Sequence, residues 1–402
     1  MPSGAIVMCQ IIHSAVGCVP LAPSSPLLNA EPDALSLLQP LLAQHPGAHT
    51  APSSSPSSFR PPHPTLTSPP LAQVTFRYAN PKTNMNVWKS VTVTNFKVAP
   101  SDKLDKRSCK SDQITVTVDP ATPTKYQIQA KFDDEVQVSL EYDQLCPGFK
   151  LGAGPKGGMT YFGQLSPKPT PAGDAPDYAA GGDGYCVHRI LPRCAVSGIV
   201  RVGGDVVDLA GSRGVFIHAI QGLRPNLLAA KWNFCNLQTL AAEGDDAVSL
   251  ILMEFTTPPG YGSKVVTVGS VVVGDKLVCV SAGGSGVVGG AQAQHLDSVV
   301  DAETGYAAPG SIKFSWEGAR LEDGKPAGGS DQKVHATVQY DLVTDKASYA
   351  TQGLVEKVDV LGQIPYLIRK FVNYAAGTKP YIYTVRPPPL SLSPTPCMSC
   401  SS

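Results

Sequence analysis

Apolar and polar residues alternate along several stretches of this chain. In residues 113–118 and 125–132 every second residue is apolar, and the residues between them are Gln, Thr or Lys. Residues 136–142 and 333–340 repeat the pattern. A period of two turns one side of a strand toward a core and the other toward water. This is typical of antiparallel sheets, because strands of parallel sheets are buried on both faces and are apolar throughout.

Further strands are predicted where β-branched and aromatic residues gather without strict alternation. They cover residues 74–78, 87–98, 195–202, 229–237, 248–257, 264–273, 276–282 and 311–316. Val202-Gly-Gly-Asp205 and Val273-Gly-Asp-Lys276 place glycine where a tight hairpin needs a positive φ. Only residues 363–375 have the spacing of an amphipathic helix, with Pro365 in the first turn.

Many strands and one late helix predict an all-β fold of two antiparallel barrels, with a C-terminal helix packed against them. The Gly/Pro-rich linker 166–184 separates an N-terminal domain, residues 71–165, from a C-terminal domain, residues 185–386. Residues 1–70 and 387–402 are rich in Pro and Ser, and we expect both to be disordered. The apolar stretch 5–19 lacks the basic start of a signal peptide.

The charge balance excludes one class of function. The 402 residues include 32 Lys and Arg and 32 Asp and Glu, so the net charge is zero. The chain therefore lacks the excess of basic residues that binding to nucleic acid requires. The 10 cysteines are scattered singly, which indicates reduced thiols in an intracellular protein. Cys235 and Cys279 lie in apolar runs and are expected in the core.

Motifs for metal, cofactor or nucleophile chemistry are missing, and we predict neither metal nor cofactor. His188, His218, His295 and His335 lie far apart in the sequence. Cys397-Met-Ser-Cys400 has no second pair to complete a metal site, and there is no Gly-x-Ser-x-Gly elbow. The glycine-rich stretch 152–158 lacks the Lys-Ser/Thr pair of a phosphate loop, so we expect a structural turn.

The polar residues available to a buried site are few: His188, Arg189, Arg193, His218 and Glu254. Glu254 interrupts the apolar run 250–255. It either points into a cavity with a raised pKa, or faces solvent or an arginine. An enzyme would need an acid/base pair, for which Glu254 and His218 are the candidates. Nothing in the sequence demands an enzyme.

Large apolar side chains are the more informative set in the C-terminal part of the chain. They are Trp232, Phe234, Met253, Phe255, Tyr261 and Trp316. In a small barrel such residues either fill the interior or line a ligand cavity, and the sequence pattern leaves both readings open.

Eight segments carry a resemblance to a known family. They include Met253-Glu-Phe-Thr-Thr-Pro-Pro-Gly-Tyr-Gly262, and the others are residues 86–96, 105–113, 147–158, 188–194, 218–226, 230–234 and 376–383. In their order along the chain and in their residues, these segments resemble the survival factor 1 family of fungi. The resemblance implies paired lipocalin-like domains in a non-enzymatic protein of the oxidative-stress response. It further implies ceramide binding and non-vesicular transfer of ceramide from the endoplasmic reticulum to the Golgi.

The resemblance also implies a place in the cell and a departure from the family. We expect a protein of the cytoplasm, with a nuclear pool and peripheral contact with endoplasmic reticulum and Golgi membranes. Residues 1–70 show neither the amphipathic membrane-binding helix nor the first strands of the family, so we expect an incomplete N-terminal barrel. Two alternatives stay open: a lipocalin-like hydratase or isomerase acting on an isoprenoid or another apolar substrate, and a stress-signalling adaptor without a ligand.

We expect the lipid in the C-terminal barrel, because an open N-terminal barrel cannot keep water from an acyl chain. The six large apolar residues are the candidates for the cavity wall. The candidates for polar contacts at the cavity are His188, Arg193, His218 and Glu254.

Overall fold

The computed structural model describes residues 6–12, 72–80, 85–98, 105, 107–152, 158–163, 184–221, 229–239, 246–287, 289–327, 332–341, 353–359 and 381–386. Nearly every described element is a β-strand, and each strand pairs antiparallel with its neighbour. Within these ranges the only helix is η1, a 3-10 turn at Pro259–Tyr261. The predicted helix at residues 363–375 lies outside the described residues.

The N-terminal half holds two sheets. The first has three strands, β1 (Ile6–Ile12), β2 (Ala72–Asn80) and β3 (Met85–Val93). The second has ten: β4 (Lys97–Val98), β5 (Cys109–Lys110), β6 (Ile114–Thr117), β7 (Lys125–Lys131), β8 (Val136–Gln144), β9 (Phe149–Lys150), β10 (Met159–Phe162), β11 (Gly184–Val202), β12 (Asp205–Asp208) and β13 (Ser212–Gln221). No hydrogen-bonded ladder joins the two sheets within the described residues, so the barrel of this half is open there.

The C-terminal half begins with a four-stranded sheet of β14 (Lys231–Gln238), β15 (Val248–Thr256), β16 (Val265–Val273) and β17 (Lys276–Gly284). A three-stranded sheet of β18 (Gln292–Leu296), β21 (Ser311–Ala319) and β24 (Lys333–Asp341) packs against it. Three short pairs complete the half: β19 (Val299–Val300) with β20 (Ala307–Ala308), β22 (Leu321–Glu322) with β23 (Lys325–Pro326), and β25 (Gly353–Asp359) with β26 (Tyr381–Arg386).

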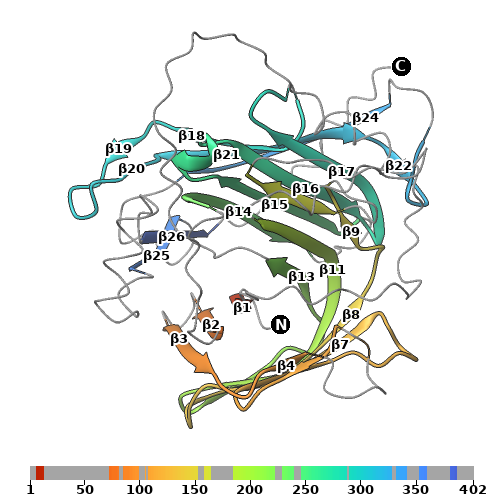
Figure 1. Ribbon diagram of the computed structural model, residues 1–402, viewed down its shortest axis with the longest axis vertical. Helices are drawn as coiled ribbons and strands as arrows, with labels where there is room; N and C mark the ends of the chain where they lie inside the picture. The colour runs from red at the N-terminus through yellow and green to blue at the C-terminus, as the bar shows by residue number, and fades with distance from the viewer. Residues whose placement is uncertain are drawn as a thin grey trace, which may run out of the picture.

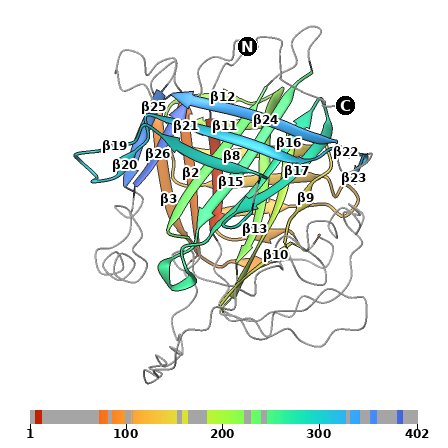
Figure 2. The same ribbon diagram turned by 90° about the horizontal axis from the view of Figure 1, so that it is seen from above.

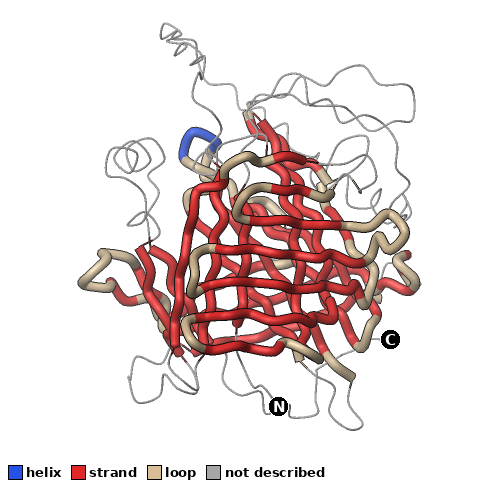
Figure 3. Tube along the Cα trace, turned by 90° about the horizontal axis from the view of Figure 1, so that it is seen from below, coloured by secondary structure: helices blue, strands red, loops and turns tan. Residues whose placement is uncertain are grey.

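In Figure 1 the ten-stranded sheet curls along the bottom of the molecule, and the sheets of the C-terminal half stack above it. Figure 2, seen from above, shows β21 and β24 lying across β8 and β11. Figure 3 gives the same impression from below, because the strands nearest the viewer run across those behind them. The predicted all-β class with antiparallel sheets is confirmed, and the ten-stranded sheet forms a curled half-barrel.

The predicted strands with strict alternation appear at their expected places as β6, β7, β8 and β24. Both predicted hairpins form, with Gly203 and Gly274 at φ 60°. The predicted strand at 195–202 is only the second part of β11, which begins at Gly184. Residues 212–221, which we had not predicted as a strand, form β13.

The linker at 166–184 does not coincide with a change of sheet. Strands β11 to β13 follow it in sequence, yet β11 pairs with β8 on one side and with β13 on the other. The chain passes to the next sheet only between Gln221 and Lys231. In the segment 1–70, which we expected to be disordered, residues 6–12 form β1 and pair with β2. The segment 387–402 lies outside the described residues.

Each half has an apolar core of its own. In the N-terminal half the alternating residues of β6, β7 and β8 pack against β2, with Phe76 and Phe132 in ring contact at 5.4 Å. In the C-terminal half the core lies between the four-stranded and three-stranded sheets and includes Cys235 and Cys279, as predicted. Because the interior of the C-terminal half, where we expected the lipid, holds packed side chains, the surface where the two halves meet becomes the first place to look for a site.

Candidate functional site

Aromatic side chains from both halves meet where β10 and β11 face the four-stranded sheet. The ring centroid of Phe162 on β10 lies 6.5 Å from that of Phe255 on β15 and 5.4 Å from that of Tyr261. The ring of Trp232 on β14 lies 5.2 Å from Phe255. We call Phe162, Trp232, Phe255 and Tyr261 the junction cluster. Rings at such spacings stabilise one another beyond their buried area.

Strand register brings the predicted residues of β14 and β15 to the junction. Trp232 pairs with Phe255 and Phe234 pairs with Met253, so these four side chains leave the sheet on the same face. Tyr261 ends η1, and Gly262 follows at φ 77°, a left-handed conformation that suits glycine. Sequence reasoning missed Phe162, which has a short strand around it and no regular alternation to mark it.

The four side chains differ in exposure. Phe255 is 1% exposed and Met253 is 5% exposed, whereas Trp232 is 47% and Phe234 is 40% exposed. Strand β14 is the edge of its sheet, so one flank of these two rings has no neighbouring strand. Half-exposed aromatic rings beside a buried aromatic cluster form an apolar surface that can accept an apolar ligand.

Trp316, the sixth predicted lipid contact, lies on the opposite face of the four-stranded sheet. It is 1% exposed in the C-terminal core, and its indole Nε1 donates a hydrogen bond of 2.7 Å to the carbonyl oxygen of Ile251. Gly269 lies so close that an added Cβ would come within 2.7 Å of the indole ring. Trp316 therefore fills the interior in which we expected the lipid, and the other five candidates do not face that interior.

His188 lies on the same face of β11 as Cys186, which packs in one buried cluster with Phe162 and Phe255. Its Nδ1 is 4.0 Å from the Cys186 Sγ, and the side chain is buried. Burial lowers the pKa of His188 to about 4, because the charged ring loses its hydration. A neutral imidazole keeps one donor and one acceptor, so it can contact an uncharged polar group.

We predict that the free energy of unfolding falls on acidification at pH values above those at which carboxylates titrate. Burial lowers the pKa of His218 to about 4 as well, while unfolded histidine titrates near 6.5. The unfolded chain therefore binds protons first, and stability should fall from about pH 6.5 toward pH 4. Thermal melting followed by circular dichroism at pH 7.5, 6 and 5 should show a decreasing midpoint. His188→Gln should flatten this dependence; an unchanged midpoint in the wild type would refute the prediction.

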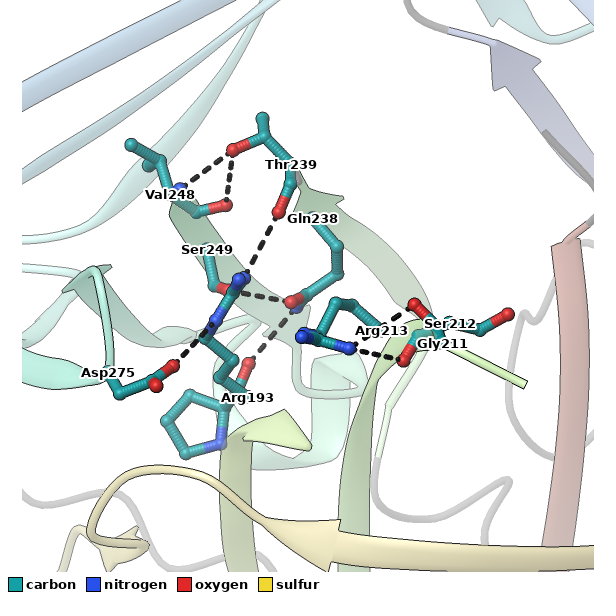
Figure 4. A network of polar contacts seen from close by, with 10 residues as sticks. Arg193, Gly211, Ser212, Arg213, Gln238, Thr239, Val248, Ser249 and Asp275 are labelled. Atoms are coloured by element: carbon teal, nitrogen blue, oxygen red, sulfur yellow. Dashed lines mark hydrogen bonds and ion pairs between the residues drawn. The ribbon is translucent and has the colours of Figure 1, made fainter. Parts of the chain in front are cut away.

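Arg193 does not line a cavity but links the two halves (Figure 4). The side chain is 3% exposed, and its Nη1 donates to the Ser249 Oγ at 2.9 Å and to the Thr239 carbonyl oxygen at 3.2 Å. Its Nε lies 3.3 Å from the Oδ1 of Asp275. Gln238 extends the network by accepting from Ser249 at 2.6 Å. These contacts give the Arg193 guanidinium a structural role between the two halves. This corrects the prediction that Arg193 lies at a ligand cavity.

Glu254 is buried on the core face of β15, and polar groups of the protein surround it. Its Oε1 accepts from the Asn233 Nδ2 at 2.8 Å, and its Oε2 accepts from the Thr267 Oγ1 and the Ala293 backbone N–H at 3.1 and 3.0 Å. His218 lies on β13 in the other half, with its ring toward the N-terminal core. The structure does not bring Glu254 and His218 together as an acid/base pair.

Five of the described thiols are buried and Cys109 is partly buried, and a buried thiol is unreactive. Burial raises the pKa of Cys146, Cys186, Cys194, Cys235 and Cys279 to about 12. In the part of the chain that the structure describes, no cluster of His, Cys, Asp and Glu could hold a metal ion. Over the same residues, no helix is long and apolar enough to cross a membrane.

A cavity of about 380 Å³ opens at the rim of the N-terminal half, between β3 and the hairpin of β11 and β12. Its lining residues are Met85, Val87, Trp88, Lys89, Glu135, Val136, Val202 and Gly203. This lining includes none of the predicted site residues, so the cavity is separate from the junction cluster.

Comparison with known proteins identifies the sequence relatives. The model of the Svf1 family matches residues 67–391. "Ceramide-binding protein svf1" of Aspergillus fumigatus is 33% identical over 300 residues, which are 75% of this chain and 63% of that protein. "Ceramide-binding protein SVF1" of Yarrowia lipolytica is 30% identical over 324 residues, 78% of this chain and 71% of that protein. The chain thus spans less than two thirds of the Aspergillus relative.

Among solved structures, kievitone hydratase from Nectria haematococca has a TM-score of 0.39 and 12% identity, covering 69% of this chain and 76% of that one. A putative AttH protein from Nitrosomonas europaea has a TM-score of 0.36 and 13% identity, covering 69% and 82%. The sequence matches, in contrast, extend along most of the chain and confirm the predicted resemblance.

Proposed function

This chain belongs to the Svf1 family, and from that premise we propose that it binds ceramide at the junction cluster. The names of its relatives supply the ligand. The observation that supports the place is the pair of half-exposed rings, Trp232 and Phe234, beside the buried part of that cluster.

The chemistry of ceramide suits this surface. Ceramide has two long apolar chains and an uncharged head group with an amide and hydroxyls. The apolar chains need an apolar surface that shields them from water, which the rings of the junction cluster and Phe234 offer. The uncharged head group needs hydrogen-bond partners but no counter-ion. The neutral His188, on the face of β11 that faces the junction cluster, can supply one hydrogen bond.

Replacing both Trp232 and Phe234 by alanine should weaken ceramide binding by about ten- to a hundredfold, because each half-exposed ring has about half of its surface left for a ligand to bury, which contributes roughly 0.7–1.4 kcal/mol. Melting should change little, since both rings are half-exposed in the free protein. Binding can be followed with a fluorescent ceramide, and melting by circular dichroism.

The matched control removes two other exposed apolar side chains, Val299 and Val300, which are 71% and 68% exposed and lie on a separate hairpin. This variant should bind ceramide like the wild type. Unchanged binding in the Trp232/Phe234 variant, or an equal loss in the control, would refute the proposed place.

The proposal extends to the cell. We infer that the protein transfers ceramide from the endoplasmic reticulum to the Golgi and supports survival under oxidative stress. On this view it resides in the cytoplasm, with a nuclear pool and peripheral contact with both membranes. The support is the family resemblance alone. Because burial raises the pKa of the five buried thiols, and also that of the partly buried Cys109, the stress role would follow from lipid handling rather than from oxidation of these six cysteines.

A further inference from the structure

A second group of polar residues lies on the other face of β11, toward the N-terminal core. The guanidinium of Arg107 is fully engaged there. Its Nε and Nη2 bind the two carboxylate oxygens of Asp105 at 2.7 and 3.0 Å, and its Nη1 donates to the Tyr126 hydroxyl at 2.9 Å. A forked pair of this kind fixes both side chains and neutralises both charges.

Arg189 adds a second guanidinium to this group. It pairs in register with His218 across β11 and β13, and its charge acts on Asp105, Tyr126 and His218. Among the described contacts, Arg189 makes no hydrogen bond or ion pair, although its side chain is half-buried. With Arg107 and Asp105 balanced, the charge of Arg189 has no counter-ion among the described contacts, and Lys150 of β9 pairs with it in register on its other side.

His218 leaves a further polar atom without a partner. Its Nδ1 is buried and has no hydrogen-bond partner in the described part of the protein. A buried polar atom of this kind is costly unless something binds it. Together, Arg189 and His218 present several donors for which the described residues supply no acceptor.

The surroundings of these donors are aromatic and apolar. The ring of Phe216, two residues before His218 on the same face of β13, lies 4.3 Å from Tyr126 and 5.7 Å from Tyr142. These rings belong to the core of the N-terminal half. The site therefore combines the positive charge of Arg189 with an apolar wall.

We propose that Arg189 and His218 bind the head group of an anionic amphiphile, in which one carboxylate or phosphate is attached to an apolar chain. The planar guanidinium of Arg189 matches the two oxygens of such a group. The Nδ1–H tautomer of His218 donates to one of them, and the rings of Phe216 and Tyr126 contact the start of the chain. This site is separate from the proposed ceramide site, because it lies on the opposite face of β11.

The test compares two fluorescent probes that differ only in charge, cis-parinaric acid and its methyl ester. The wild type should bind the acid at least about tenfold more tightly, because a hydrogen bond to a charged group contributes more than one to a neutral group. Arg189→Gln should remove this preference. Equal binding of acid and ester by the wild type would overturn the proposal whether or not the variant folds.

Arg213 provides the matched control. It lies on β13, the strand of His218, but on the other face, and its Nη1 donates to the carbonyl oxygens of Gly211 and Ser212. Arg213→Gln should keep the preference for the acid. If Arg189→Gln keeps it too while circular dichroism shows a native fold, the assignment to Arg189 is wrong.

Competition identifies the head group. Oleate that displaces the acid better than lysophosphatidate assigns a carboxylate, and the reverse order assigns a phosphate. Inorganic phosphate that displaces it as well as either lipid would overturn the claim that the ligand is an amphiphile. The variant lacking Trp232 and Phe234 should bind the acid normally, so failure of this proposal and of the ceramide proposal can be told apart.

Discussion

Replacing Trp316 by alanine should lower the free energy of unfolding by about 3–5 kcal/mol, the range for removing a large buried aromatic side chain. Trp316 is 1% exposed, and its indole N–H donates to the Ile251 carbonyl at 2.7 Å. Truncation would leave a cavity between the two sheets of the C-terminal half. It would also leave the Ile251 carbonyl without this donor.

Trp232 is the internal comparison, because it is the same residue type on the other face of the sheet. Trp232→Ala should cost at most about 1 kcal/mol, since almost half of the side chain is already in water. Urea unfolding followed by circular dichroism measures both variants without relying on tryptophan fluorescence. If the two substitutions cost the same, the separation into a core tryptophan and a surface tryptophan is wrong.

Arg193→Ala should destabilise the protein by about 2–4 kcal/mol, because it removes the donors to Ser249 and Thr239 between the two halves. Arg193→Lys should not restore the loss. A single ammonium cannot reproduce the planar fork that reaches Ser249, Thr239 and Asp275 together. Melting temperature and the urea midpoint report the change.

Asp275→Asn separates the buried from the exposed part of this network. Asp275 is 61% exposed in the ion pair with Arg193, so its loss should cost less than about 1 kcal/mol. A larger loss for Asp275→Asn than for Arg193→Ala would show that the ion pair, and not the buried hydrogen bonds, holds the halves together.

The sequence predicted strands best where alternation was strict. Residues 125–131 form β7 with buried and exposed residues in turn, as the pattern indicates. Strand β13 was missed because Gly214 and His218 interrupt its apolar pattern. Gly214 is closely packed: a Cβ there would come within 3.0 Å of Val196 and 3.3 Å of the Tyr142 ring, so one of these side chains would have to shift. A local pattern contains no information about such a contact with distant strands.

The candidate site was predicted in part. The sequence singled out Trp232, Phe234, Phe255 and Tyr261, and the structure gathers them on one side of the four-stranded sheet. It did not reveal Phe162, which completes the cluster from the other half. The role of Arg193 depends on partners at residues 239, 249 and 275, which only folding brings together.

By itself the sequence determined the antiparallel all-β class, the positions of its most regular strands and the family. Both the alternation of apolar and polar residues and the residues of a motif are properties of neighbouring positions in the chain. Which face of a strand meets which partner was decided only by the tertiary structure. Strand β15 shows the reason: it is buried along both faces, so its composition cannot distinguish Glu254 and Leu252 in the core from Phe255 and Met253 at the junction. The sheets packed on its two sides make that distinction, and one comes before β15 in the sequence and the other after it.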